Sequence, residues 1–443
     1  MPTLFGTSGV RGPVDTLFTP QFSFDLGRTF AMFLDQQSQF GRVCLGIDTR
    51  TSSPHIANNL IEGLRYQGRE VVHLGALPTP AVHYAHISGG FVAAVMITGS
   101  HIDLTSNGVK FFAFKEEITK EQESAISDIY QQIKNQVTVT PLSQLPTQSS
   151  LGFDNYLSLL LSLADQPLPS RRIVFDPGNG GQTETIHHLL RQLSQEVIPI
   201  NNSIQDVLLS RDTELDDAFK NLSQVVVEQK ADLGIGFDSD GDRIIFVDHL
   251  GHSLAGDISG SLLAKWYAGG PIVCPVNVSQ VVEHLHKQVV RTKVGSPFVI
   301  EGMKKFGANF GFESNGGCIH EDVMLSRDGG VTLVKMLNIL KWSGKSLSEL
   351  VSEFPQYSLA KTKFSLPKDK YETLYQGLKN FGPPVRTDLT DGVKLYLDDH
   401  TWVLFRGSGN APEFRVFAES LSIERTRQLI NDGVSFAQKL IHV

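Results

Sequence analysis

Residues 42–74, RVCLGIDTRTSSPHIANNLIEGLRYQGREVVHL, contain the clearest structural pattern of the chain. An apolar run at 42–47 ends in Asp48, a helical pattern follows at 54–67, and a second apolar run occupies 70–74. Strand, helix and strand at this spacing predict a βαβ unit, in which the two strands lie parallel in one sheet and the helix covers it.

The same unit occurs twice more along the chain. An apolar run at 173–175 leads into DPGNGG, and a helical pattern at 184–193 and another apolar run at 197–200 follow. The third copy repeats strand, helix and strand at 271–276, 280–288 and 289–294. We therefore expect three consecutive α/β domains, with their ligand-binding loops at the carboxyl ends of the strands.

The C-terminal part of the chain has a different pattern. Two apolar runs, 393–397 and 401–405, flank the polar tripeptide DDH and predict a β-hairpin. Residues 414–418 alternate like a strand, and 422–441 have a helical pattern. A small α+β domain is expected here.

Turn-forming and polar residues collect at three places, which are typical of domain boundaries. These places are 138–150, 248–251 and 354–366. We therefore expect four domains, at 1–140, 150–250, 251–360 and 367–443.

The composition is typical of a cytoplasmic globular protein. A chain of 443 residues is too long for one core, and 41% apolar with 19% charged residues supports several cores. The net charge of −8 argues against nucleic-acid binding. No signal-peptide pattern is present, and the longest apolar run, 91–97, is too short to span a membrane. Cys44, Cys274 and Cys318 lack metal-ligand spacing, so we expect reduced, partly buried thiols.

The segment GIGFDSDGDR, which ends at Arg243, places Asp238, Asp240 and Asp242 at alternate positions. Their mutual repulsion raises their pKa values unless a cation neutralises them, and a loop with few protein ligands favours Mg²⁺. An EF-hand does not fit, because that loop needs Gly where Arg243 stands and Glu where His249 stands. A solvated acidic turn is the alternative. The arginine suggests that a phosphate shares the site.

The segment MITGSH begins in the last two residues of a predicted buried strand, 91–97, and places Ser100 and His101 in a glycine-containing turn. Lys110 follows a short way along the chain. A serine hydroxyl is a weak nucleophile unless a base or a metal activates it. On its own, this motif also fits an ordinary surface turn.

Two later loops contain groups suited to phosphate and sugar. RGSGNAPEFR combines Arg406, Ser408 and Asn410 with two glycines, and such a loop can direct several donors at one anion. GFESNGG contains Glu313 and Asn315, whose side chains suit sugar hydroxyls. Each loop also fits a turn without a ligand.

Near the chain start, FGTSGVRG places a single arginine, Arg11, among small residues, which on its own also fits a mobile terminus. Together, the five motifs in this order resemble the α-D-phosphohexomutases over nearly the whole chain. That family includes phosphoglucomutase, phosphomannomutase and phosphoglucosamine mutase. The resemblance implies three related α/β domains with mixed, mostly parallel sheets and a small C-terminal α+β domain around a central cleft.

The resemblance also implies a role for each candidate residue. Ser100 matches the phosphorylated serine, His101 its neighbour, and Lys110 a proposed general acid/base. The implied metal ligands are a phosphoserine oxygen at Ser100 and the carboxylates of Asp238, Asp240 and Asp242. Two arginines, Arg11 and Arg243, match groups near the phosphoserine.

Substrate binding is implied for two further groups of residues. Glu313 and Asn315 match positions that contact sugar hydroxyls. Arg406, Ser408 and Asn410 match the family's loop for the phosphate that is not transferred.

Three places depart from the family pattern. Ile102-Asp103 follows Ser-His where many relatives have Asn-Pro, and Gly317 stands where many have histidine. Asn277 and Ser296 replace a common lysine and histidine. These changes bear on the sugar preference, and the TGSH and GFE variants look most like the branch labelled phosphomannomutase.

The resemblance implies an enzyme that interconverts hexose 1-phosphate and hexose 6-phosphate. Its cofactors would be Mg²⁺ and a hexose 1,6-bisphosphate, the latter as activator and intermediate. The substrate would be mannose phosphate, with glucose phosphate or both epimers as the alternative. We expect a monomer or weak homodimer without membrane or nucleic-acid partners. A metal-dependent sugar phosphatase and a non-catalytic sugar-phosphate sensor are the alternatives from other classes.

Overall fold

The computed structural model describes residues 4–6, 9–138, 144–215, 217–409 and 412–441. Asn410 lies outside these ranges, and so does part of the boundary expected at 138–150. The chain forms two compact units. Unit 1 comprises Met1–Ala255 and Asn315–Ser348, and unit 2 comprises Gly256–Ser314 and Glu349–Val443.

Unit 1 begins with a six-stranded mixed sheet in the order β1-β5-β4-β2-β3, with β6 beside β5. The central strands β2, β3 and β4 are parallel, as the first βαβ unit predicts, whereas β5 runs antiparallel to β4 and β1. The strands are β1 (Val10–Pro13), β2 (Val43–Ile47), β3 (Val71–Ala76), β4 (Ala93–Ile97), β5 (Ser106–Ala113) and β6 (Glu116–Glu117).

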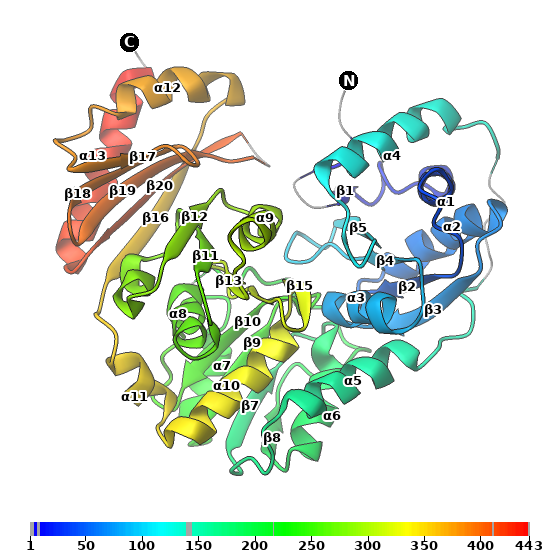
Figure 1. Ribbon diagram of the computed structural model, residues 1–443, viewed down its shortest axis with the longest axis horizontal. Coiled ribbons are helices and arrows are strands. Elements are labelled where there is room, and N and C mark those ends of the chain that lie inside the picture. Colours follow the sequence, from blue (N-terminus) through cyan, green and yellow to red (C-terminus); the bar gives the residue numbers. More distant parts are fainter. Residues whose placement is uncertain (1–3, 7–8, 139–143, 216, 410–411, 442–443) are drawn as a thin grey trace. The chain divides into compact units, whose positions relative to one another are not determined.

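Four helices cover this sheet on its two faces (Figure 1). They are α1 (Pro20–Gln36), α2 (Ser53–Tyr66), α3 (Thr79–Ser88) and α4 (Lys120–Ile133). Helices α1, α2 and α4 share one buried apolar core with the sheet, in which Phe30 and Leu60 pack with Val95. On the other face, the ring of His83 in α3 stacks on Phe112 of β5 at 4.6 Å. Both faces are therefore covered, which accounts for the fully buried strands β2 and β4.

The second sheet of unit 1 has four strands in the order β10-β9-β7-β8. Its parallel strands β7, β8 and β9 confirm the second βαβ prediction, and β10 returns antiparallel beside β9. The strands are β7 (Arg172–Asp176), β8 (Glu196–Pro199), β9 (Leu233–Phe237) and β10 (Ile244–Asp248). Helices α6 (Gln182–Gln192) and α7 (Lys220–Glu228) pack on this sheet, whereas α5 (Leu151–Leu163) packs against α3 and α6.

The second segment of unit 1 adds a hairpin and a long helix. Strands β14 (Cys318–His320) and β15 (Met324–Arg327) pair antiparallel, and α10 (Gly329–Ser343) follows directly. Asp328 caps α10 by accepting a hydrogen bond from the Val331 N–H at 2.9 Å. Helix α10 packs on α5, so this segment belongs to the core of unit 1.

Unit 2 contains the third copy of the βαβ pattern. Strands β11 (Ile272–Pro275), β12 (Val289–Thr292) and β13 (Phe310–Phe312) are parallel in the order β12-β11-β13. Helices α8 (Gly256–Tyr267) and α9 (Ser296–Phe306) contact these strands. The α-helix expected at 280–288 is wrong in type, because the structure has the 3₁₀ helix η1 (Gln280–Leu285) there. His286 ends this helix after six residues with a left-handed backbone, φ 54°.

The C-terminal sheet of unit 2 is antiparallel, in the order β16-β20-β19-β18-β17. The hairpin, strand and final helix predicted at 393–441 are all present. The elements are α11 (Leu347–Ser352), which begins at the end of unit 1, β16 (Ser358–Ser365), η2 (Lys368–Lys370), α12 (Tyr371–Leu378), β17 (Arg386–Asp388), β18 (Val393–Asp398), β19 (Thr401–Gly407), β20 (Glu413–Ser420) and α13 (Ile423–Ile441).

Strand β16 departs from the expected boundary at 354–366. All eight of its residues pair with β20, so this segment belongs to the C-terminal sheet. Its sequence, SLAKTKFS, is polar enough to resemble a linker because β16 is an edge strand whose alternate side chains are exposed.

Buried polar groups join this sheet to the other part of unit 2. Lys394 donates a hydrogen bond to the Val276 carbonyl at 2.7 Å, and Glu419 accepts one from the Gln280 N–H at 3.0 Å. The indole Nε1 of Trp402 donates to the same carboxylate at 2.7 Å. Breaking one of these hydrogen bonds would leave a buried polar group without a partner, and this cost stabilises the observed arrangement within unit 2.

The three cysteines are buried, as expected, and lie on β2, β11 and β14. Among the described residues, the helices are all too short or too polar to cross a membrane.

Candidate active site

The loop after β4 places Ser100 at the end of a buried parallel strand. Ser100 is fully buried, and its backbone has φ 49°, in the left-handed region that non-glycine residues adopt at a cost. Its Oγ donates a hydrogen bond to Asp238 Oδ2 at 3.2 Å and lies 3.2 Å from His101 Nδ1. The hydroxyl predicted to be a nucleophile therefore faces the acidic cluster.

The acidic cluster lies at the carboxyl end of β9. Asp238, Asp240 and Asp242 are all buried, and one oxygen from each lies within 4.8 Å of the others. Among the described residues, Oδ1 of Asp240 and Oδ1 of Asp242 have no hydrogen-bond partner. Buried carboxylate oxygens without partners are costly, and a hard divalent cation such as Mg²⁺ fits such a set of donors.

Cationic side chains surround the three carboxylates. Lys110 on β5 donates to Asp240 Oδ2 at 2.8 Å and to Asp242 Oδ2 at 3.3 Å. The side chain of Arg243 lies 3.7 Å from both Asp238 and Asp242. Arg11 on β1 is registered opposite Gly108 of β5 and is close enough to interact with Asp240 and Asp242. The structure thus places the three predicted cationic residues of unit 1, Arg11, Lys110 and Arg243, beside the acidic cluster.

Burial and charge shift the pKa values in this cluster. Burial, together with the carboxylates of Asp240 and Asp242, raises the pKa of Asp238 well above its usual value. Burial opposes the charge on Lys110, but the two neighbouring carboxylates outweigh it and raise the pKa of the lysine. Burial and nearby arginines lower the pKa of His101 to about 2. At neutral pH, Lys110 is therefore charged and His101 is neutral.

Arg50 shapes the Ser100 loop and was missed by the sequence analysis. Its Nη2 donates to the carbonyls of Ser100 and Ile102, each at 2.7 Å, and its Nη1 donates to the carbonyl of Asp103 at 3.0 Å and to that of Ser106 at 3.2 Å. The Nε atom donates to Asp48 Oδ2 at 3.2 Å.

Glycine is needed beside this arginine. A Cβ atom at Gly99 would lie 2.6 Å from the guanidinium carbon of Arg50. The same carboxylate oxygen of Asp48 also accepts a hydrogen bond from the Gly99 N–H at 3.2 Å. Because its donors are all engaged by the loop or by Asp48, Arg50 holds the loop and is not free to bind phosphate.

Replacing Arg50 with lysine is expected to lower kcat by roughly 100-fold, because one ammonium cannot hold four carbonyls and a small misplacement of a reacting group has this effect. KM for sugar phosphate should change less than about threefold. Steady-state kinetics and thermal unfolding should be compared with Arg65→Lys, a matched change on the outer face of α2 where the side chain is 41% exposed. A wild-type kcat with only a lower Tm would show that Arg50 merely stabilises the domain.

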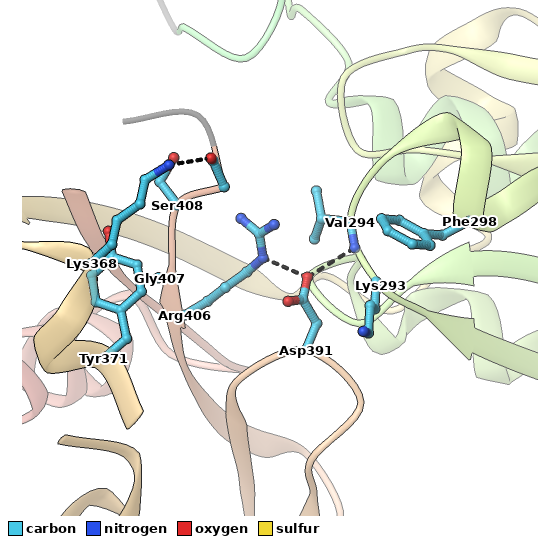
Figure 2. Close-up of a pocket in the computed structure, with 10 residues that line it drawn as sticks. Lys293, Val294, Phe298, Lys368, Tyr371, Asp391, Arg406, Gly407 and Ser408 are labelled. Atoms are coloured by element: carbon cyan, nitrogen blue, oxygen red, sulfur yellow. Dashed lines mark hydrogen bonds and ion pairs between the residues drawn. The ribbon is translucent and has the colours of Figure 1, made fainter. Parts of the chain in front are cut away.

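A pocket of about 340 Å³ in unit 2 contains the predicted phosphate loop. Figure 2 shows the Arg406 guanidinium beside Asp391, whose Oδ2 accepts hydrogen bonds from Arg406 Nε at 2.6 Å and from the Val294 N–H at 2.9 Å. Lys293 and Lys368 also line the pocket, so it combines several donors with positive charge. Such a site suits one phosphate group.

The remaining candidate residues divide between the two units. Ser408 lies in the pocket of unit 2, and Glu313 is buried at the end of β13 in the same unit. Asn315 belongs to unit 1, where its carbonyl accepts a hydrogen bond from Thr213 Oγ1 at 2.7 Å. Of the departures from the family pattern, Asn277 donates to Ser314 Oγ at 3.1 Å, and Ser296 begins α9.

Comparison with known proteins identifies the family of the chain. Models of the phosphoglucomutase/phosphomannomutase α/β/α domains I, II and III match residues 2–137, 154–251 and 247–357, respectively. The chain therefore belongs to the phosphoglucomutase/phosphomannomutase family, the α-D-phosphohexomutases, whose members are isomerases.

Relatives of similar identity have different names. A phosphoglucomutase/phosphomannomutase of Thermococcus kodakarensis is 30% identical over 457 aligned positions, which cover all of both chains. A phosphoglucosamine mutase of Caldanaerobacter subterraneus is 33% identical over 458 positions, again over all of both chains. A phosphomannomutase of Salmonella muenchen is 31% identical, over 97% of this chain and 95% of that one.

A solved structure supports the fold. The crystal structure of a phosphoglucomutase/phosphomannomutase family protein from Burkholderia thailandensis superposes with a TM-score of 0.84 at 21% identity. The match covers 99% of this chain and 97% of the other. Three α/β domains with mixed sheets are thus confirmed as the fold class.

Proposed function

We propose that the chain is a phosphohexomutase that interconverts hexose 1-phosphate and hexose 6-phosphate through phosphorylated Ser100. The single observation that carries this proposal is the 3.2 Å separation between Ser100 Oγ and Asp238 Oδ2. It brings a nucleophile at a strand end together with a buried carboxylate set suited to a divalent cation. The reaction would pass through a hexose 1,6-bisphosphate.

Each residue of the cluster would have a separate part in phosphoryl transfer. Asp238, Asp240 and Asp242 would hold Mg²⁺, which supplies positive charge that stabilises the transferring group. A sugar hydroxyl attacks phosphorus, the bond from phosphorus to Ser100 Oγ breaks, and the hydroxyl proton ends on that oxygen. Lys110 or neutral His101 would relay the proton, and the contact of His101 Nδ1 with Ser100 Oγ favours His101.

The pocket around Arg406 would hold the phosphate that is not transferred. Since the bisphosphate must present each end in turn, this pocket would bind phosphate without distinguishing C1 from C6. Asp391 would fix the Arg406 guanidinium by its 2.6 Å contact and leave the other guanidinium nitrogens for the ligand. Ser408 and Asn410 would contribute further polar contacts.

Replacing Arg406 with alanine is expected to raise KM for sugar phosphate by about 10- to 100-fold, the usual effect of losing charged hydrogen bonds. The Mg²⁺ concentration for half-maximal activity should stay within about twofold, since the pocket and the carboxylates lie in different units. Arg425→Ala on the exposed side of α13 provides the matched control. An unchanged KM in Arg406→Ala would contradict the role of this pocket.

For the sugar, we propose mannose phosphate first, with glucose phosphate also accepted. The support for this order is the residues of the TGSH and GFE motifs. The names of the relatives do not choose between sugars, because relatives of comparable identity include enzymes named for mannose, glucose and glucosamine. Initial rates with the three hexose 1-phosphates test this order. A highest kcat/KM for glucosamine 1-phosphate would overturn it. Release of inorganic phosphate in place of isomerised sugar would instead indicate a phosphatase.

A further inference from the structure

Arg327 reaches the acidic cluster from the end of β15. Its Nη2 donates a hydrogen bond to Asp242 Oδ2 at 2.6 Å, and its side chain is only 10% exposed. Neither the motif analysis nor the family resemblance assigns this residue a part in the site. Burying a charged group is costly unless it is paired, and the partner of this guanidinium is a carboxylate predicted to hold a metal.

Gly317 makes room for this arginine. A Cβ atom at position 317 would lie 2.4 Å from Cδ of Arg327 and 3.1 Å from its Cγ. The backbone of Gly317 is not among the glycines that have positive φ, so its conformation does not require glycine. The absence of a side chain at 317 therefore serves the path of Arg327 to Asp242, which also explains why the sequence has glycine at this place.

The contact fixes how Asp242 presents its two oxygens. Oδ2 accepts from Arg327 and from Lys110, whereas Oδ1 has no hydrogen-bond partner among the described residues. Two cations on Oδ2 hold the carboxylate in a single orientation. Oδ1 lies 3.7 Å from Arg243 Nε and, within the part of the chain that the structure describes, makes no hydrogen bond that a metal ion would have to displace. Arg327 thus orients the group that the proposed function assigns to Mg²⁺.

Arg327 also changes the charge balance of the site. Four cationic side chains then accompany the three carboxylates, namely Arg11, Lys110, Arg243 and Arg327. A positive charge near a metal ion repels the ion but attracts the doubly charged phosphoryl group. Consistently, burial and the charges of Arg243, Arg11 and Arg327 act together on His101, beside Ser100, and depress its pKa.

We propose that Arg327 is a positioning residue for phosphoryl transfer, which orients Asp242, offsets the charge of the phosphoryl group and depends on the absence of a side chain at Gly317. This inference rests on the proposed function. It predicts opposite effects on the two kinds of ligand. Lys110 still holds Oδ2 of Asp242 when Arg327 is replaced, so the main effect on the metal should be the loss of repulsion. Metal binding should therefore become tighter, whereas the transfer of the anionic group should become slower.

Three variants separate charge from geometry. Arg327→Met removes both, Arg327→Lys keeps the charge, and Gly317→Ala leaves Arg327 intact but obstructs its path. Arg191→Met on the exposed side of α6 and Gly270→Ala, where an added Cβ would meet nothing closer than 3.9 Å, are the matched controls. Mn²⁺ affinity is measured by electron paramagnetic resonance without substrate, alongside kcat, KM and thermal unfolding.

Arg327→Met is expected to bind Mn²⁺ about threefold to tenfold more tightly and to lose roughly 100-fold in kcat. Arg327→Lys should keep wild-type Mn²⁺ affinity within about twofold and recover part of kcat. Gly317→Ala should reproduce much of the loss in kcat. Unchanged Mn²⁺ affinity and kcat in Arg327→Met would overturn the proposal, and so would a fall in Tm with no change in either quantity.

The Mn²⁺ measurement keeps this inference distinguishable from the proposed function. If hexose 1,6-bisphosphate fails to phosphorylate wild-type Ser100, the mutase proposal fails, whereas tighter Mn²⁺ binding by Arg327→Met still supports Arg327 beside the metal site. If the wild type is phosphorylated and the Arg327 variants match it in both measurements, the inference fails alone. Should Arg327→Met not fold, Gly317→Ala and Arg327→Lys still decide the question.

Discussion

Replacing Ser100 with alanine is expected to lower mutase turnover by about 10⁴-fold or more, because the variant has no oxygen to carry the phosphoryl group. The protein should still fold. Alanine can adopt the backbone of Ser100 at a cost similar to serine, and the hydroxyl's hydrogen-bond contacts within the described part of the chain are those with Asp238 and His101. We expect the free energy of unfolding to fall by no more than about 2 kcal/mol.

Steady-state isomerisation and denaturant unfolding of Ser100→Ala should be measured beside Ser127→Ala. Ser127 lies on α4, where its Oγ donates a hydrogen bond to the Glu123 carbonyl. Ser127→Ala therefore measures the effect of losing a serine hydroxyl elsewhere in the protein, without changing the site. Turnover of Ser100→Ala near the wild-type value would show that another group carries the phosphoryl group. A variant that is inactive and also unfolded would be followed by Ser100→Cys, which keeps a side chain of similar size.

Replacing Asp240 with asparagine is expected to weaken Mg²⁺ binding by about 100-fold or more and to lower activity in parallel. The orientation of the new amide explains the size of the effect. Oδ2 of Asp240 accepts from Thr79 Oγ1 at 2.7 Å and from Lys110 at 2.8 Å, so the asparagine oxygen must take that place. The amide NH₂ then replaces Oδ1, the oxygen available to the cation, and a donor cannot bind it.

Isothermal titration with Mg²⁺, without sugar phosphate, separates this effect from a loss of substrate binding. Asp128→Asn on the exposed face of α4 removes the same charge from unit 1 and should leave Mg²⁺ affinity unchanged. If Asp240→Asn bound Mg²⁺ like the wild type, the three carboxylates would not form the metal site.

The repeating pattern of the sequence was sufficient to predict most of the fold. The parallel strands of the three βαβ units and the C-terminal hairpin were recognised because apolar runs of strand length alternate with helical patterns. Residues 280–288 were predicted as an α-helix, but two adjacent β-branched valines and an early left-handed residue leave only a short 3₁₀ helix. The segment of strand β16 resembles a domain boundary in sequence because an edge strand can be as polar as a loop.

The candidate site was predictable where its residues follow strands. Ser100 follows β4 and Asp238 follows β9, and loops at the carboxyl ends of parallel strands are where ligands bind in α/β sheets. Arg50 carried a signal of the same type, since it follows β2 and Asp48, but its four carbonyl partners are set by the path of the loop. Arg327 had no such signal, because its contact with Asp242 joins residues 85 positions apart in sequence.

The most direct test of the account is to follow one phosphoryl group through Ser100. The protein is treated with glucose 1,6-bisphosphate, freed of it, mapped by peptide mass spectrometry and then mixed rapidly with excess mannose 1-phosphate. A phosphoserine mechanism requires phosphate on Ser100 alone, which passes to the sugar at least as fast as kcat. Phosphate on another residue, or its departure as inorganic phosphate, would rule this mechanism out.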